Sequence, residues 1–294
     1  MATARPTSKA VQPSRSAPAA SVAARTGGFP KTKYFSIVPL HLAFSIFAIY
    51  YLPSKYLNAR PDQDHGGFVD SLVRCPYQSL FVMNVGLVSV QIWFSSYLRS
   101  WRKASLNTTT ASKQPSKTHP KLDLHKVWSD FGARKVDPRV STALLELALL
   151  LQETVLITFL ATFAIHVLMV LLGAGLVRDG GKTFLLATML SILAIFPPAF
   201  VIGWNQSREK QTWIRLFSSL QPKNELELAL LCPAFGACLG CWLGAFPIPL
   251  DWDRPWQTWP ITCVVGTSIG HACGTITAMI LCALGAPFCT TQKK

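Results

Sequence analysis

Charged residues are scarce in this sequence. Asp, Glu, Lys and Arg make up 14% of its 294 residues, while 50% are hydrophobic. Soluble globular domains use about 25% charged residues. Six stretches contain no charged residue at all: 34–54, 75–98, 154–177, 183–207, 228–250 and 255–292. This distribution excludes an ordinary soluble domain.

Each uncharged stretch is long enough to cross a membrane. A bilayer core needs about 20 apolar residues of helix, and only helices or closed barrels satisfy their backbone in lipid. The apolar runs are continuous rather than alternating, so they predict helices. We therefore expect an all-α, polytopic membrane protein, a bundle of six transmembrane helices near 35–53, 76–98, 154–177, 183–203, 228–247 and 260–286.

Acidic residues are fewer than basic ones, which gives a net charge of +14. A basic chain can bind nucleic acid, but the distribution of these charges argues against it. With six spans, 22 of the 28 Lys and Arg residues lie on the side that holds both termini. The opposite side has six: Lys55, Arg60, Arg74, Arg178, Lys182 and Arg254. The asymmetry predicts cytosolic termini and some attraction to anionic membrane lipids.

The segments between the spans differ in composition. Residues 1–33 contain no acid and are rich in Ala, Ser, Pro and Arg, which indicates a disordered basic cytosolic tail. A mitochondrial transit peptide is the alternative. Residues 139–153 have a helical pattern and either lie along the membrane surface or lengthen the third span. The expected organisation is a tail 1–33, helices one and two in 34–98, a partly disordered cytosolic loop 99–143, helices three to six in 144–286, and a tail 287–294.

Groups that hold metals or perform catalysis are also sparse. Cys238 and Cys241 match C-x-x-C, but no second pair or nearby His accompanies them. His41, His166 and His271 each stand alone in a predicted span, where a structural role is expected. We expect no catalytic set, no metal and no cofactor.

Glycine recurs at every fourth position in the last two spans. The fifth has Gly236, Gly240 and Gly244, and the sixth has Gly266, Gly270 and Gly274. Positions four apart share one face of a helix, and small residues let membrane helices approach closely. Two such stripes in one hairpin predict more packing surface than the chain itself needs, leaving some for another protein.

The turn between these spans is dense in Pro, Trp and Asp. Its candidate docking residues, on the predicted lumenal side, are Pro247, Pro249, Asp251, Trp252, Asp253, Arg254, Pro255 and Trp256. Pro247 and Pro249 are expected to stop the fifth span, and Pro260 suits the first turn of the sixth. Asp251 and Asp253 beside Arg254 are a possible set for a divalent metal and a phosphate. The alternative is structural: Asp253 caps a turn and Asp251 pairs with Arg254.

The run GAFPIPLDWDRPWQTWPI at 244–261, with FPPAF at 196–200 and the glycine-striped last helix, resembles the PIG-F family. The resemblance extends from Leu145 to Ala286. Residues 1–33 and 104–125 show nothing characteristic of the family, and their length and composition are similar to a fungal elaboration. It implies a multi-pass protein of the endoplasmic reticulum membrane that acts in glycosylphosphatidylinositol (GPI) anchor biosynthesis. Its implied role is a non-catalytic subunit that stabilises large ethanolamine-phosphate transferases acting on the third, and also the second, mannose of the GPI precursor. In that family the metal-dependent catalytic domain belongs to the partner chain.

Two other functions are alternatives to this role. A lipid-modifying membrane enzyme would use Asp251, Asp253 and Arg254 as a lumenal phosphate or metal site, with His271 as a further group. His271 lies about 16 Å along the helix from the turn, however, which makes a shared site awkward. A transporter is disfavoured because no internal repeat is visible.

Overall fold

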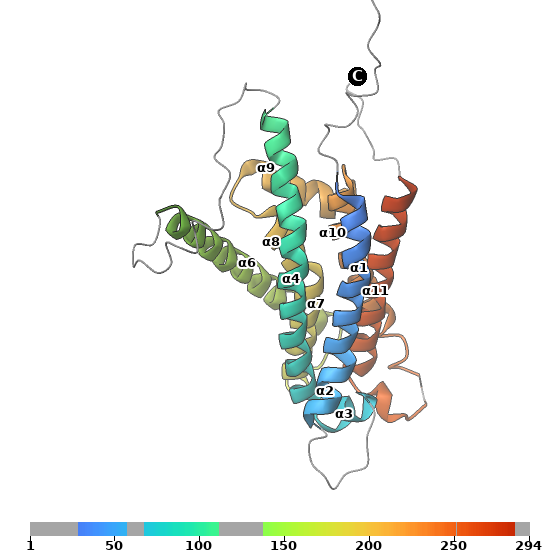
Figure 1. Cartoon of the computed structure of the whole chain (residues 1–294). Coiled ribbons are helices and arrows are strands. Elements are labelled where there is room, and N and C mark those ends of the chain that lie inside the picture. The colour runs from blue at the N-terminus through green and yellow to red at the C-terminus, as the bar shows by residue number, and fades with distance from the viewer. Residues whose placement is uncertain (1–28, 58–67, 112–137, 251, 286–294) are drawn as a thin grey trace, which may run out of the picture.

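The computed structural model describes residues 29–57, 68–111, 138–250 and 252–285 (Figure 1). All regular structure in these residues is helical. Six helical segments are long and apolar enough to cross a membrane: Lys31–Ser54, Pro76–Asn107, Leu145–Leu171, Gly180–Ile202, Glu225–Leu243 and Ile261–Leu284. The predicted all-α, six-helix membrane architecture is therefore confirmed.

The helices follow one another up and down the bundle. Their bounds are α1 Lys31–Ile46, the π-helical η2 Phe47–Tyr51, α2 Leu52–Leu57, α3 Phe68–Arg74, α4 Pro76–Ala111, α6 Pro138–Leu171, α7 Gly180–Ala194, α8 Phe196–Ile202, α9 Ser207–Trp213, the π-helical η3 Ile214–Ser218, α10 Glu225–Leu243, the 3-10 helix η4 Pro255–Gln257 and α11 Ile261–Leu284. The start of α1 and the end of α11 lie at the same end of the bundle (Figure 1). We call this the terminal end and the opposite one, which carries η4, the turn end.

Three predicted boundaries were wrong. The second span does not end at 98, because α4 continues to Ala111 and takes in the start of the predicted loop. The third span is not 154–177, because α6 runs unbroken from Pro138 to Leu171. Residues 139–153 thus lengthen this helix instead of forming a separate surface helix. The fifth span does not reach Pro247, because α10 ends at Leu243 and a series of turns follows. The prolines therefore lie beyond the helix end and do not stop it.

The fourth span breaks at its prolines, as the sequence indicated. α7 ends at Ala194 and α8 begins at Phe196, with Pro197 and Pro198 in its first turn. A proline in a helix removes a backbone donor and clashes with the preceding turn. The short helix α8 is held by α4, where the Arg99 Nη1 donates to the Phe200 carbonyl (2.6 Å) and the Arg102 Nη1 donates to the carbonyls of Val201 (2.7 Å) and Ile202 (2.5 Å).

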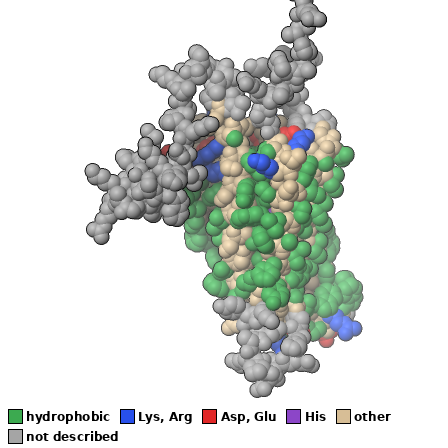
Figure 2. All heavy atoms as spheres, in the orientation of Figure 1, with side chains coloured by type: hydrophobic (Ala, Val, Ile, Leu, Met, Phe, Trp, Pro, Cys, Tyr) green, Lys and Arg blue, Asp and Glu red, His purple; other side chains and the backbone are tan. Residues whose placement is uncertain are grey.

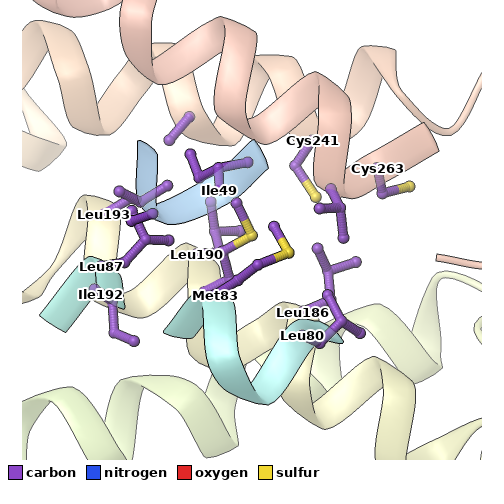
Figure 3. Close-up of a cluster of buried hydrophobic side chains, with 14 of the residues drawn as sticks. Ile49, Leu80, Met83, Leu87, Leu186, Leu190, Ile192, Leu193, Cys241 and Cys263 are labelled. Atoms are coloured by element: carbon purple, nitrogen blue, oxygen red, sulfur yellow. The ribbon is translucent and has the colours of Figure 1, made fainter. Parts of the chain in front are cut away.

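The core lies around α7, whose span is 83% buried. Figure 3 shows leucines of α7 meeting leucines and a methionine of α4, with Ile49 from η2 and two cysteines from α10 and α11 on the other side. The labelled residues are Ile49, Leu80, Met83, Leu87, Leu186, Leu190, Ile192, Leu193, Cys241 and Cys263. Helix α6 differs, because only 17% of its span is buried and it leans away from the other helices (Figure 1).

Hydrophobic side chains cover the flank of the bundle, while the visible charged side chains gather toward its two ends (Figure 2). Exposed leucines and phenylalanines are costly in water, whereas lipid accepts them. The surface of the described residues is thus that of a multi-pass membrane protein.

Candidate functional site

Helices α10 and α11 form an antiparallel hairpin whose glycines face each other. A Cβ atom added to Gly240 would collide with the Gly266 carbonyl oxygen, and one added to Gly236 would collide with that of Gly270. The reverse additions, at Gly266 and Gly270, would collide with the carbonyls of Gly240 and Gly236. The two backbones are therefore in direct contact along a line that we call the glycine seam.

The seam continues at both ends. A Cβ on Gly244 would strike the Thr262 carbonyl, and one on Gly274 would strike the Cys232 carbonyl. All six striped glycines are thus used inside the chain. The two stripes pack against each other, and the expectation that they leave a packing face for another protein stays a prediction.

An apolar groove runs along the outer side of the seam. It has a volume of about 880 Å³. The glycines line its floor, and its walls are Phe235, Leu239 and Leu243 of α10 with Val265, Ile269 and Cys273 of α11. Leu220 and Leu231 lie toward the terminal end, and Pro247 and Trp256 toward the turn end. We call it the seam groove.

The turn after α10 is organised by Gln257, which the sequence reasoning missed. Its amide nitrogen donates to the carbonyls of Pro247 (2.8 Å) and Leu250 (2.7 Å), and its amide oxygen accepts from the Arg254 backbone nitrogen (3.0 Å). One side chain therefore ties both halves of the turn together. The sequence signal was a single amide among prolines, whose missing N–H groups leave backbone carbonyls in need of a side-chain donor.

The tryptophans of the turn have different roles. Trp252 is exposed and meets Trp256 edge to face, with ring centroids 5.7 Å apart. The Trp259 indole nitrogen donates to the Thr183 hydroxyl at 3.0 Å and so fastens the turn to α7. Pro260 is the residue just before α11 rather than part of its first turn.

The charged turn residues lie at the surface. Asp253 is exposed and has a left-handed backbone (φ 46°), and Arg254 is exposed beside it. Arg254, not Asp253, is the residue that precedes η4. Pro249 and Pro255 are exposed as well. Asp251 lies outside the described residues, and so does its expected pairing with Arg254.

His271 does not join the turn. It is buried (4% exposed) in the bundle interior, where its ring lies 5.6 Å from that of His41, measured between centroids. Gln91 of α4 is a further polar side chain that is fully buried in the bundle. Among the described residues, no three His, Cys, Asp or Glu side chains gather in a group that could hold a metal ion. His271 therefore lies apart from Asp253. It is not part of the lumenal phosphate or metal site that the lipid-modifying enzyme would need.

A polar cluster at the terminal end was also missed. Arg215 donates to both oxygens of Glu227, at 2.7 and 2.8 Å, and the hydrogen bond raises the pKa of the Arg215 guanidinium. Glu227 also accepts from the Lys223 backbone nitrogen (2.7 Å), and Asn224 caps α10 by accepting from the Glu227 backbone nitrogen (2.9 Å). The signal was Asn224 with Glu three residues later, a pattern typical of a helix start.

Glu153 makes further polar contacts at this end. Its carboxylate accepts from the Trp204 backbone nitrogen (2.6 Å) and the Asn205 amide (3.0 Å). The Trp213 indole donates to the Gly203 carbonyl at 2.9 Å. The link from α8 to α9 is thus anchored to α6, which explains why α6 carries a charge where the third span was expected to begin.

Fold and surface together define a multi-pass helical membrane protein built around a glycine-sealed hairpin with an ordered Trp- and Pro-rich turn. Residues 65–279 match the GPI biosynthesis protein family Pig-F. The chain belongs to this family.

Several curated relatives are similar to the chain. Glycosylphosphatidylinositol anchor biosynthesis protein 11 of Pyricularia oryzae is 43% identical over 121 residues, 41% of this chain and 43% of the relative. The GPI ethanolamine phosphate transferase, stabilizing subunit, of Homo sapiens is 38% identical over 117 residues, 40% of this chain and 52% of the relative. The anchor biosynthesis protein 11 of Yarrowia lipolytica is 35% identical over 161 residues, 55% and 65% of the two chains. The first-named matches thus span about half the length of these relatives, and no solved structure matches the chain.

Proposed function

We propose that this chain is a non-catalytic membrane subunit that stabilises and assembles transferases in GPI-anchor biosynthesis. The partner enzymes would add ethanolamine phosphate to the third, and also the second, mannose of the GPI precursor. The observation that carries the proposal is the family match over 65–279, together with relatives named as a stabilizing subunit of GPI ethanolamine phosphate transferase.

The endoplasmic reticulum membrane is the proposed location, with the terminal end in the cytosol and the turn end in the lumen. The pathway in the relatives' names supports the compartment. The charge distribution supports the orientation, since 22 of the 28 Lys and Arg residues lie on the side of the termini. The turn with Trp252, Asp253 and Arg254 would then face the compartment in which the mannoses are decorated.

Residues of the turn between α10 and α11 are the proposed docking element for the large transferase. They are Pro247, Pro249, Asp251, Trp252, Asp253, Arg254, Pro255 and Trp256. The support is that the turn is well ordered. Gln257 ties its two halves together and Trp259 fastens it to α7, so the outward-facing side chains of the turn are presented without a large entropy cost on binding. Tryptophan and arginine are also the residues that most often anchor interfaces.

The first experiment compares the purified chain, the transferase and their complex in ethanolamine-phosphate transfer to a GPI precursor. We expect no transfer by this chain alone, and a transferase that is more abundant and more active when the chain is present. Transfer catalysed by the chain alone would overturn the proposal and favour the lipid-modifying enzyme.

The second experiment tests the turn. Asp253→Asn should lower the amount of transferase recovered with the chain while leaving the chain's own abundance unchanged, because Asp253 is exposed. Asp70→Asn is the matched control, an exposed aspartate of α3 at the same end of the bundle. Equal recovery with both variants would exclude Asp253 from the docking element.

A further inference from the structure

Three polar side chains lie inside the bundle, each near the middle of its membrane span. His41 is residue 11 of the 24 in the first span, Gln91 is residue 16 of the 32 in the second, and His271 is residue 11 of the 24 in the sixth. All three are buried, with exposed fractions of 1%, 0% and 4%. Ionisable and polar groups at this depth are costly, so their presence indicates a site that gives them partners.

The three side chains are neighbours that do not satisfy one another. The rings of His41 and His271 lie 5.6 Å apart between centroids, and the Gln91 amide lies beside His41. The His271 ring also approaches the backbone of Pro233 in α10. Within the described part of the chain, neither histidine ring and neither polar atom of Gln91 has a protein group in direct hydrogen-bonding geometry. The same is true of the Ser95 hydroxyl, one turn from Gln91 on α4. We call His41, Gln91, Ser95 and His271 the midplane cluster.

The groups of the midplane cluster require hydrogen-bond partners. Buried polar atoms are almost always paired with protein or with ordered water, because an unpaired atom loses the hydration that it has in the unfolded chain. A neutral imidazole has one donor and one acceptor, and an amide has two donors and an acceptor. The cluster therefore needs an occupant that both donates and accepts.

Charge and size identify this occupant. The four stretches that supply the middle of α1, α4, α10 and α11 contain no charged residue, so no side chain there balances the charge of an ion. The space is small, because the Phe94 ring stacks on His41 with centroids 4.1 Å apart and the His271 ring follows on another side. Water is neutral, donates and accepts, and joins polar groups about 5 Å apart through two hydrogen bonds of about 2.9 Å each.

From depth, burial and polar atoms without protein partners, we propose that the midplane cluster is a water-binding site in which ordered water joins His41, Gln91 and His271. The water links α1 and α4 to the last hairpin at a depth where lipid offers no hydrogen bond. It thereby helps to fix which residues of these helices stand opposite one another. The site uses side chains of this chain alone, so it does not rest on the proposed function.

The test is X-ray radiolytic labelling of the full-length chain in nanodiscs, read residue by residue by mass spectrometry. Hydroxyl radicals form from water where it is bound, and they oxidise the side chains that it touches. We expect oxidation of Phe94, His41 and His271 in spite of their burial. Phe196 is the internal control, because it is 4% exposed like Phe94 but packs in an apolar cluster. It should not be oxidised.

Two variants remove parts of the site. Gln91→Leu should lower the oxidation of Phe94 about fivefold, which is the occupancy lost with one hydrogen bond. Ser79→Ala is the matched control and should leave it unchanged, because Ser79 is buried in the same helix but donates to the Ser71 carbonyl at 2.9 Å. His271→Phe repeats the test from α11 and takes the place of Gln91→Leu if that protein does not elute as a single species on size exclusion.

Three results would overturn the proposal. Phe94 oxidised as little as Phe196 in the unaltered chain would show that the cluster is dry and that its groups pair directly. One metal ion per purified chain, lost in the His271→Phe protein, would show that the imidazoles bind a cation. Equal oxidation of Phe94 in the Gln91, His271 and Ser79 variants would show that the water lies elsewhere.

Discussion

The glycine seam makes a quantitative prediction at Gly240. In Gly240→Ala, the new Cβ would lie 2.9 Å from the Gly270 Cα and closer still to the Gly266 carbonyl oxygen. Both obstacles are backbone, so no side-chain rotation relieves them. The helices must move apart by about one ångström to restore van der Waals contact, which also loosens the neighbouring glycine contacts.

Two opposing effects decide the sign. Replacing a helical glycine by alanine normally stabilises by about 0.5–1 kcal/mol, because the unfolded chain loses freedom. Overpacking costs typically about 1–3 kcal/mol, and the upper part of this range applies to a clash with backbone. The clash therefore exceeds the entropic gain by about 2 kcal/mol. For a chain of this size the melting temperature should fall by about 4–8 °C.

The measurement is a thermal melt of detergent-solubilised protein, followed by the fraction that remains monodisperse on size exclusion. Gly180→Ala is the matched control, because Gly180 begins α7 and a Cβ there would have no other atom within 4 Å. It should leave the melting temperature equal or slightly higher. A Gly240→Ala protein that melts like the Gly180→Ala protein would refute the seam as a close-packed contact.

Three further changes should act on individual contacts. Glu227→Gln keeps the shape of the side chain but removes the charge that Arg215 contacts bidentately. In the same melt we expect the free energy of unfolding to fall by about 1–3 kcal/mol. An unchanged melt would contradict a structural role for the Arg215–Glu227 pair. Gln257→Leu removes two donated hydrogen bonds and should speed proteolysis and hydrogen exchange within the turn, while an unchanged rate would exclude it as the organiser of the turn. Arg102→Leu removes the donor to the last carbonyls of α8 and should cost about 1.5–3 kcal/mol, whereas Lys103→Leu, at an exposed neighbour, should cost less than about 0.5 kcal/mol.

The six spans could be predicted from the sequence because charge is excluded from a bilayer core almost without exception. The boundary of the third span could not, because the uncharged run begins only after Glu153, whereas a carboxylate does not end a helix. In the structure Glu153 stays within α6 and accepts hydrogen bonds from Trp204 and Asn205. Its partners come from a distant loop, and no local pattern contains them.

The glycine stripes were visible in the sequence, but their partner was not. Spacing shows that Gly236, Gly240 and Gly244 share a face, and it does not show what that face meets. The register supplies this information: Gly236 opposes Gly270, Gly240 opposes Gly266, and Gly244 opposes Thr262. Each pair is centred on the same point of the turn, so an antiparallel hairpin brings the two stripes together automatically.

This register distinguishes two roles of the hairpin that the sequence alone did not separate: packing within the chain and contact with a partner. The glycines hold α10 against α11, and the face of their backbone that points across the seam is used for this contact. What the hairpin presents outward is the consequence of that contact: an apolar groove where glycine has no side chain, and a turn whose Trp252 and Arg254 point to solvent. A stabilising subunit has to keep its own fold while it supports a larger chain. The seam serves the first need, and the side chains of the turn are therefore where contacts that serve the second should be sought.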